Sequence, residues 1–158
     1  MQLIFKQRIF SFLDSYDIYS QTGEVVYKIK GELAVGHRFR VLDAYNNEVG
    51  YLRQRLLTFL PKFEIYKNGV LFGTLKKELS FLKPRYSIDY NGWTAEGNFF
   101  EWDYRILSPS GMLIATVSKQ FLKLTDTYVI DVFDDDAALD VLLFVLAIDA
   151  EKCSRENG

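Results

Sequence analysis

The residues of this chain that could bind a charged ligand are concentrated between Arg53 and Arg85. This stretch holds eight basic residues against two acidic ones, a local net charge of +6, whereas the whole chain has a formal charge of −2. Clustered Lys and Arg side chains attract phosphate groups, including those of anionic lipids. The candidate residues for lipid or phosphate binding are Arg53, Arg55, Lys62, Lys76, Lys83 and Arg85.

Pairs of apolar residues accompany the basic ones at three bends of the chain, and each pair is followed within two residues by a lysine. An apolar pair beside a cation can insert shallowly between lipid head groups. The alternative interpretation is that the pairs plug one end of the fold, while the lysines form a solvated outer face that discourages edge pairing. The candidates for membrane contact are Phe59, Leu60, Phe81 and Leu82, with Phe121-Leu122 as a third copy.

Residues that could do catalytic chemistry are few and isolated. The single histidine, His37, has no paired acid or cysteine motif, so it cannot be assigned the role of a general base. The single cysteine, Cys153, has cationic neighbours but no surrounding nucleophile signature. Glu96, Glu101 and Asp103 could approach one another and serve a hydrolase, which stays open as a minor alternative. We therefore assign no catalytic residue and expect a protein that is not an enzyme.

Binding of a metal, a cofactor or nucleic acid finds no support in the sequence. The run Asp134-Asp135-Asp136 lacks the spaced ligands and turn glycine of a calcium loop, and its carboxylates suit a helix cap better. The glycines are scattered at turns and form no phosphate-binding or dinucleotide-binding motif. The isoelectric point of about 5.5 argues against binding to a nucleic-acid backbone. We expect neither a metal nor a cofactor.

The single cysteine excludes an intramolecular disulfide and favours a reducing compartment. The N-terminal segment breaks its apolar run with Lys6 and Arg8 and has no small-residue cleavage site, so it predicts a strand rather than a secretory signal. We expect a cytoplasmic monomer that is peripheral to the membrane and does not span it.

Turn signals occur at regular intervals along the first 130 residues, and the segments between them are rich in Val, Ile, Phe and Tyr. Asn68-Gly69 and Asn91-Gly92 are typical of tight hairpin turns. The segment 49–69 also overlays 72–92 with an offset of 23 residues, so the chain resembles a meander of similar hairpins. About twelve strands are predicted, near residues 2–8, 15–20, 24–32, 36–43, 48–56, 62–67, 70–79, 84–90, 93–99, 102–108, 112–121 and 126–133.

Alternation within the repeated unit places Leu52 and Leu56 on the inward face of a strand. Polar residues break this pattern at Gln54, Lys77 and Lys119, one in each of three copies of the unit. We predict a β-bulge near the strand end at these positions. The alternative is that these side chains reach toward the mouth of a barrel.

The segment from Ala137 to Ala150 is apolar almost all the way round and predicts a helix over about 136–150. Such a helix must be buried, and only the strands can bury it, which predicts a closed antiparallel barrel around a central C-terminal helix. The segment is shorter than the roughly 20 residues of a membrane span and contains Asp140 and Asp149, so no transmembrane span is expected. We expect one domain over residues 1–158.

Three stretches of sequence carry a family resemblance. They are IFKQRIFSFLDSYDIYSQTGEVVYKIKG near the start, the repeated LLTFLPKFEIYKNG and LSFLKPRYSIDYNG, and the closing TDTYVIDVFDDDAALDVLLFVLAID. These stretches are similar to the LURP-one-related family, which is grouped with the tubby C-terminal domain and the phospholipid scramblases. The resemblance covers nearly the whole chain, and its motifs are structural rather than catalytic. It implies a mainly β, tubby C-terminal-like barrel of twelve strands that is threaded by the hydrophobic helix.

The resemblance also bears on function, because tubby domains bind phosphoinositide head groups through a basic surface and scramblases act at membranes. Only the basic character carries over to this chain, since no lipid-site motif matches residue by residue. We therefore expect a non-enzymatic barrel domain that binds phospholipids or phosphoinositides at the membrane surface. The alternative is a structural or protein-interaction scaffold in stress or defence responses.

Overall fold

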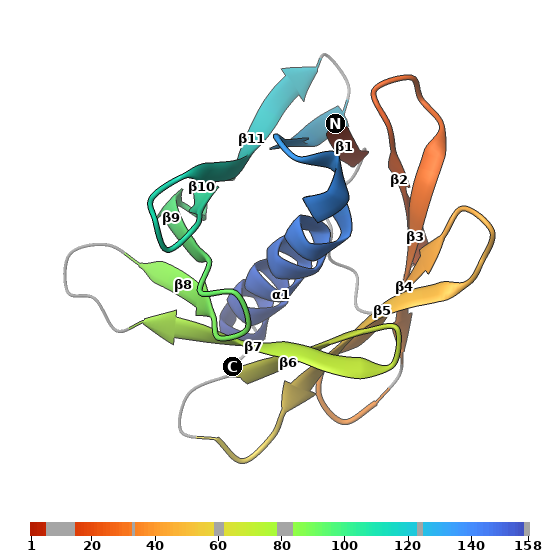
Figure 1. Ribbon diagram of the computed structural model, residues 1–158. Coiled ribbons are helices and arrows are strands. Elements are labelled where there is room, and N and C mark those ends of the chain that lie inside the picture. Colours follow the sequence, from red (N-terminus) through yellow and green to blue (C-terminus); the bar gives the residue numbers. More distant parts are fainter. Residues whose placement is uncertain (6–14, 33, 59–61, 79–83, 123–124, 157–158) are drawn as a thin grey trace.

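The computed structural model describes residues 1–5, 15–32, 34–58, 62–78, 84–122 and 125–156, and it is a closed β-barrel around one long helix (Figure 1). Within the described residues, twelve antiparallel strands pair in sequence order, and β1 closes the barrel by pairing with both β2 and β12. This confirms the predicted fold class. The strands are β1 (Gln2–Phe5), β2 (Ser15–Tyr19), β3 (Val25–Glu32), β4 (Arg38–Asp43), β5 (Glu48–Arg55), β6 (Lys62–Lys67), β7 (Val70–Glu78), β8 (Arg85–Ile88), β9 (Thr94–Asn98), β10 (Asp103–Leu107), β11 (Leu113–Leu122) and β12 (Thr125–Val132).

The helix α1 (Ala138–Glu156) runs through the interior of the barrel (Figure 1). Its apolar segment has no polar side that could face water, so it has to be buried. All residues from Val141 to Ile148 are at most 2% exposed. The short 3-10 helix η1 (Asp135–Ala137) precedes α1, and the Asp134 carboxylate caps η1 by accepting a backbone N–H bond, as predicted. The helical segment ends later than the predicted residue 150.

The connections between elements divide the barrel into two ends. At the short-turn end lie the connections β2–β3, β4–β5, β6–β7, β8–β9 and β10–β11, together with the passage from β12 into η1. At the long-loop end lie the connections β3–β4, β5–β6, β7–β8 and β9–β10. The last turns of α1 also reach the long-loop end, where the Lys152 ammonium donates a hydrogen bond to the Phe99 carbonyl of the β9–β10 connection.

The predicted β-bulge at the polar breaks in alternation is wrong. Strand register is continuous at Gln54, Lys77 and Lys119. In the described strands, register shifts occur instead nearer the short-turn end. Gln54 accepts a hydrogen bond from the His37 N–H at 3.1 Å, and the two lysine ammonium groups lie 6.0 and 5.8 Å from the centres of buried tyrosine rings. Side chains that reach toward the barrel mouth therefore explain the pattern.

Candidate functional site

The basic candidates lie on the outer face of four neighbouring strands, except Lys83, which is outside the described residues. Those described are Arg53 and Arg55 on β5, Lys62 on β6, Lys76 on β7 and Arg85 on β8. Arg55 and Lys62 are directly opposite each other in the β5–β6 register. The fold therefore gathers these cations on one side of the barrel, toward the long-loop end.

Glu64 on β6 holds two of these arginines. The residue is only 7% exposed, and its carboxylate accepts hydrogen bonds from Arg53 at 2.5 and 3.0 Å and from the Tyr66 hydroxyl at 3.0 Å. Arg55 lies 3.3 Å from the same carboxylate. Burial acts to raise the pKa of Glu64, but the hydrogen bonds and the two guanidinium charges outweigh it and hold the pKa below its ordinary value. One carboxylate therefore serves two arginines.

The remaining basic candidates also have acidic neighbours, with one exception. Arg85 lies 3.2 Å from Glu96 on β9, and Lys76 lies 3.6 Å from a carboxylate in the β8–β9 connection. Ion pairs at the surface contribute little to stability. Lys62 makes no ion pair within the described part of the chain. The charge counted along the sequence is thus largely neutralised in space, and Arg55 and Lys62 are the cations best placed to meet an external anion.

An exposed group of apolar side chains, which the sequence analysis missed, lies beside these two cations. Leu56, expected on the inward face, is 48% exposed and Leu57 is fully exposed, because β5 ends at Arg55 and the alternation ends with it. Leu57 has a φ of 63°, a left-handed conformation that costs a non-glycine residue about 1–2 kcal/mol. A Cβ at Gly36 would lie 3.2 Å from Leu56, so Leu56 lies beside Gly36, and the residue before Gly36, Val35, is also exposed. We call Val35, Leu56 and Leu57 the apolar tip.

The predicted membrane contacts Phe59, Leu60, Phe81 and Leu82 lie outside the described residues, as do the side chains of Phe121 and Leu122. The sequence did hold one signal for the apolar tip. Adjacent side chains of a strand point to opposite faces, so the run Leu56-Leu57 indicates that one of the two leucines lies on the outer face.

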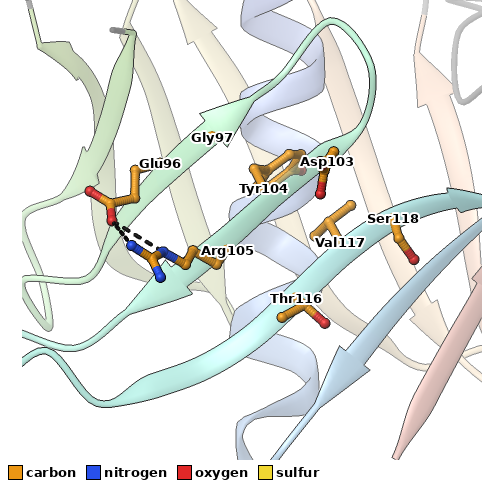
Figure 2. Close-up of a pocket in the computed structure, with 8 residues that line it drawn as sticks. All are labelled: Glu96, Gly97, Asp103, Tyr104, Arg105, Thr116, Val117 and Ser118. Carbon is orange, nitrogen blue, oxygen red and sulfur yellow. Dashed lines mark hydrogen bonds and ion pairs between the residues drawn. The ribbon is translucent and has the colours of Figure 1, made fainter.

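A hollow of about 480 Å³ on the outer face of β9, β10 and β11 contains two of the three carboxylates considered for a hydrolase, Glu96 and Asp103 (Figure 2). The third, Glu101, lies in the β9–β10 connection and is not part of the lining, and its backbone N–H donates to the Asn98 side chain at the end of β9 at 3.2 Å. Glu96 faces Arg105, and their hydrogen bond at 2.8 Å is the main reason that the pKa of Glu96 lies below its ordinary value. The acid of glycoside hydrolysis needs a raised pKa, so this hollow does not favour that chemistry.

His37 and Cys153 are both partly buried, and neither lines the hollow. Burial lowers the pKa of His37. The His37 N–H donates to the Gln54 side chain, and the His37 carbonyl accepts from the Gln54 N–H. These bonds give His37 a structural role at the long-loop end of the barrel. Among the described residues, no group of three or more His, Cys, Asp or Glu side chains is arranged to hold a metal ion.

Comparison with known proteins agrees with this architecture. The family profile of the LURP-one-related proteins matches residues 1–149. The chain belongs to the LURP-one-related family. It is 23% identical over 150 residues to the uncharacterized protein YxjI of Bacillus subtilis (strain 168), with 94% of this chain and 92% of YxjI covered. The X-ray structure of an Arabidopsis thaliana protein has the same fold, with a TM-score of 0.61 at 15% identity over 92% of this chain and 89% of that one.

LURP-one-related membership accounts for the barrel and its central helix, and it does not suggest a catalytic function. Among the described residues of this LURP-one-related protein, no helix is long and apolar enough to cross a membrane. A ligand for the barrel has to be inferred from what its surfaces expose.

Proposed function

We propose that this barrel is a peripheral membrane-binding module that docks its long-loop end onto anionic phospholipid head groups. The observation that carries the proposal is the position of Leu57, which is fully exposed two residues after Arg55, the cross-strand partner of Lys62. In water, a strained and exposed leucine contributes nothing to folding. At a bilayer surface, its side chain enters the interface while the two cations meet phosphate groups.

Two separate contributions would hold the barrel at the bilayer. Complete transfer of a leucine or valine side chain out of water contributes roughly 1.5–3 kcal/mol, and each Lys or Arg near an anionic surface contributes about 1 kcal/mol. Insertion at the interface is shallow, so neither contribution suffices alone. Binding should therefore be reversible, weakened by salt, and dependent on anionic lipid.

Arg55 can meet a phosphate group without leaving Glu64. A guanidinium carries five N–H donors, and the Arg55 Nε is the atom that faces Glu64, at 3.3 Å. Its terminal nitrogens can therefore donate to a phosphate. Arg53, in contrast, directs both Nε and a terminal nitrogen to Glu64 and also donates to Tyr66, which is a structural arrangement. Arg55 and Lys62 are thus the proposed phosphate contacts.

Vesicle flotation tests the proposal. Phosphatidylcholine vesicles are compared with vesicles that also contain phosphatidylserine or, at matched charge, phosphatidylinositol bisphosphate. We expect the protein to float only with the anionic vesicles, and the Arg55→Glu/Lys62→Glu and Leu57→Asp variants to lose this binding. Lys28→Glu, on the outer face of β3, and Leu71→Asp, exposed near the short-turn end, are the matched controls. If more protein floats with the phosphatidylinositol bisphosphate vesicles than with the phosphatidylserine vesicles, the barrel prefers phosphoinositide head groups.

Equal recovery on neutral and anionic vesicles would overturn the proposal. So would normal flotation of both variants at low salt. The variants must have the circular dichroism spectrum and urea midpoint of the wild type, so that a loss of flotation reports on the surface and not on folding.

A further inference from the structure

The short-turn end carries a second set of exposed apolar side chains, one at each of five connections. We call Tyr45, Val70, Tyr90, Met112 and Phe133 the apolar rim; they are between 61% and 85% exposed. Their connections, from β4–β5 to the passage from β12 into η1, follow one another around the barrel. Among the described residues, every exposed large apolar side chain lies at or next to one of the two ends. The middle parts of the described strands expose none.

Local contacts order the ring of Tyr90 and the backbone at Tyr45 and Phe133. The ring of Tyr90 lies 4.1 Å from that of Phe72, centre to centre. The Tyr45 N–H donates to the Asp43 carboxylate at 2.9 Å, and the Phe133 N–H donates to a carbonyl of β11 at 3.1 Å. Anchors that are already ordered lose little entropy on binding. Gathered apolar side chains of this kind, with aromatic residues and methionine among them, are typical of protein interfaces.

The same end of the barrel is acidic. Its six connections and the strand residues that flank them hold one lysine, Lys67, which is already paired with Asp140 of α1 at 2.6 Å. Hydrogen bonds from the Asn47 side chain and backbone hold the pKa of Asp43 below its ordinary value, so Asp43 is ionised at neutral pH. The carboxylates of these connections and of the residues beside them are Glu24, Asp43, Glu48, Asp89 and the run 134–136.

Three of these carboxylates have cationic partners: Glu48 lies 2.6 Å from Arg40, Asp89 lies 3.6 Å from Lys76, and Asp135 lies 2.9 Å from the N-terminal ammonium. The Lys28 ammonium also reaches this end, where it donates to Asn46 at 2.8 Å. Among the described residues, Glu24, Asp43, Asp134 and Asp136 make no ion pair, and they keep this end acidic.

We infer that the apolar rim is a docking surface for a partner protein segment that is basic and carries apolar side chains. The rim supplies the apolar anchors of the interface. The surrounding carboxylates supply charge complementarity, which speeds association and rejects acidic partners. The same charge repels an anionic bilayer, so the rim is not a second membrane contact. This inference is independent of the proposed function, which concerns the opposite end of the barrel.

A second copy of this chain is the competing occupant, because its long-loop end is also basic and apolar. Contact between the long-loop end of one copy and the short-turn end of the next is heterologous, and it extends into a filament unless it closes into a ring. A partner of different sequence leaves the long-loop end open for lipid. The dependence of molecular mass on protein concentration distinguishes the two occupants.

The test uses a synthetic amphipathic peptide of lysine and leucine as the probe. A peptide of glutamate and leucine and a peptide of lysine and serine are the matched controls. We expect the protein to bind the lysine-leucine peptide at least about tenfold more tightly than either control, with NMR chemical-shift changes confined to the short-turn end. Tyr90→Asp and Met112→Asp should each weaken this binding by about tenfold. Phe100→Asp, an exposed residue of the β9–β10 connection, should bind as the wild type does.

Several results would overturn the inference. One is chemical-shift changes at the long-loop end or over the wall. Another is equal binding of the lysine-serine peptide, which would mean that charge alone acts. Self-association in ultracentrifugation that Leu57→Asp abolishes would assign the rim to a second copy, and loss of vesicle flotation in Met112→Asp would assign it to the membrane. If the protein does not float with anionic vesicles but still binds the lysine-leucine peptide, only the proposed membrane function is wrong. The two experiments therefore test the two proposals separately.

Discussion

Gly50 on β5 lies so close to Leu143 of α1 that a Cβ at Gly50 would stand 2.6 Å from the Leu143 Cδ2. Leu143 is fully buried, and the Cβ of Val41 on β4 borders the same space at 3.3 Å. The wall therefore approaches the helix at this point because glycine has no side chain. The equivalent residue of the next hairpin, Gly73, is also closely packed, but against the β8–β9 connection rather than the helix, since its Cβ would lie 2.9 Å from that of Tyr90.

We predict that Gly50→Ala lowers the free energy of unfolding by about 1–3 kcal/mol, because the added methyl group overpacks the contact with Leu143. Urea unfolding measures the change. In the Leu143→Ala background, which leaves room for the methyl group, Gly50→Ala should be neutral or stabilising. Additive losses in the double variant would mean that Gly50 matters for a reason other than this contact.

Glu64 should make the stability of the barrel depend on pH. Its pKa is lower in the folded protein than in the unfolded chain, so its contribution is present above the ordinary glutamate pKa and is lost as the pH falls through the folded value. Glu64→Gln should therefore be less stable than the wild type at pH 7, by urea unfolding, and the difference should shrink toward pH 3. A difference that stays constant with pH would show that packing, and not the charge on Glu64, stabilises this contact.

Replacing Leu57 by glycine should raise the stability of the barrel and weaken its binding to vesicles. Its φ of 63° is strained for leucine but not for glycine, so Leu57→Gly should raise the free energy of unfolding by up to about 1 kcal/mol. The same variant should float less well with anionic vesicles, because the exposed side chain is gone. Thermal unfolding and flotation of one preparation measure both effects. A less stable Leu57→Gly variant would indicate that the leucine has a packing role.

The strands and the buried helix could be predicted because their signals are local. Asn68-Gly69 has positive φ at both residues, as a tight hairpin turn requires, and the segment around Leu143 is apolar on every side. The alternation of residues has no such signal for the end of a strand. Leu56 follows the same period as Leu52, yet it is exposed because pairing stops one residue earlier, at Arg55.

The electrostatics of the candidate site could not be predicted from a window of sequence. The pairing of β8 with β9 places Glu96 opposite Arg85, and the β8–β9 connection brings a carboxylate to Lys76. Both acids lie beyond the stretch in which the basic residues were counted. Cross-strand neighbours decide how much of a charge excess remains, and they are known only once the register is known.

Two buried tyrosines inside the barrel should respond in opposite ways to the loss of their hydroxyl groups. The Tyr86 hydroxyl donates to the Glu151 carboxylate, whereas the Tyr104 hydroxyl has no hydrogen-bond partner among the described residues. Burial, and then the charge of Asp149, raise the pKa of Tyr104, so that hydroxyl stays protonated. We predict that Tyr86→Phe lowers the free energy of unfolding by about 1–3 kcal/mol, because it removes a buried donor from a carboxylate. Tyr104→Phe should be neutral or slightly stabilising in the same urea titration. An equal loss in both variants would mean that a buried water bonds to Tyr104.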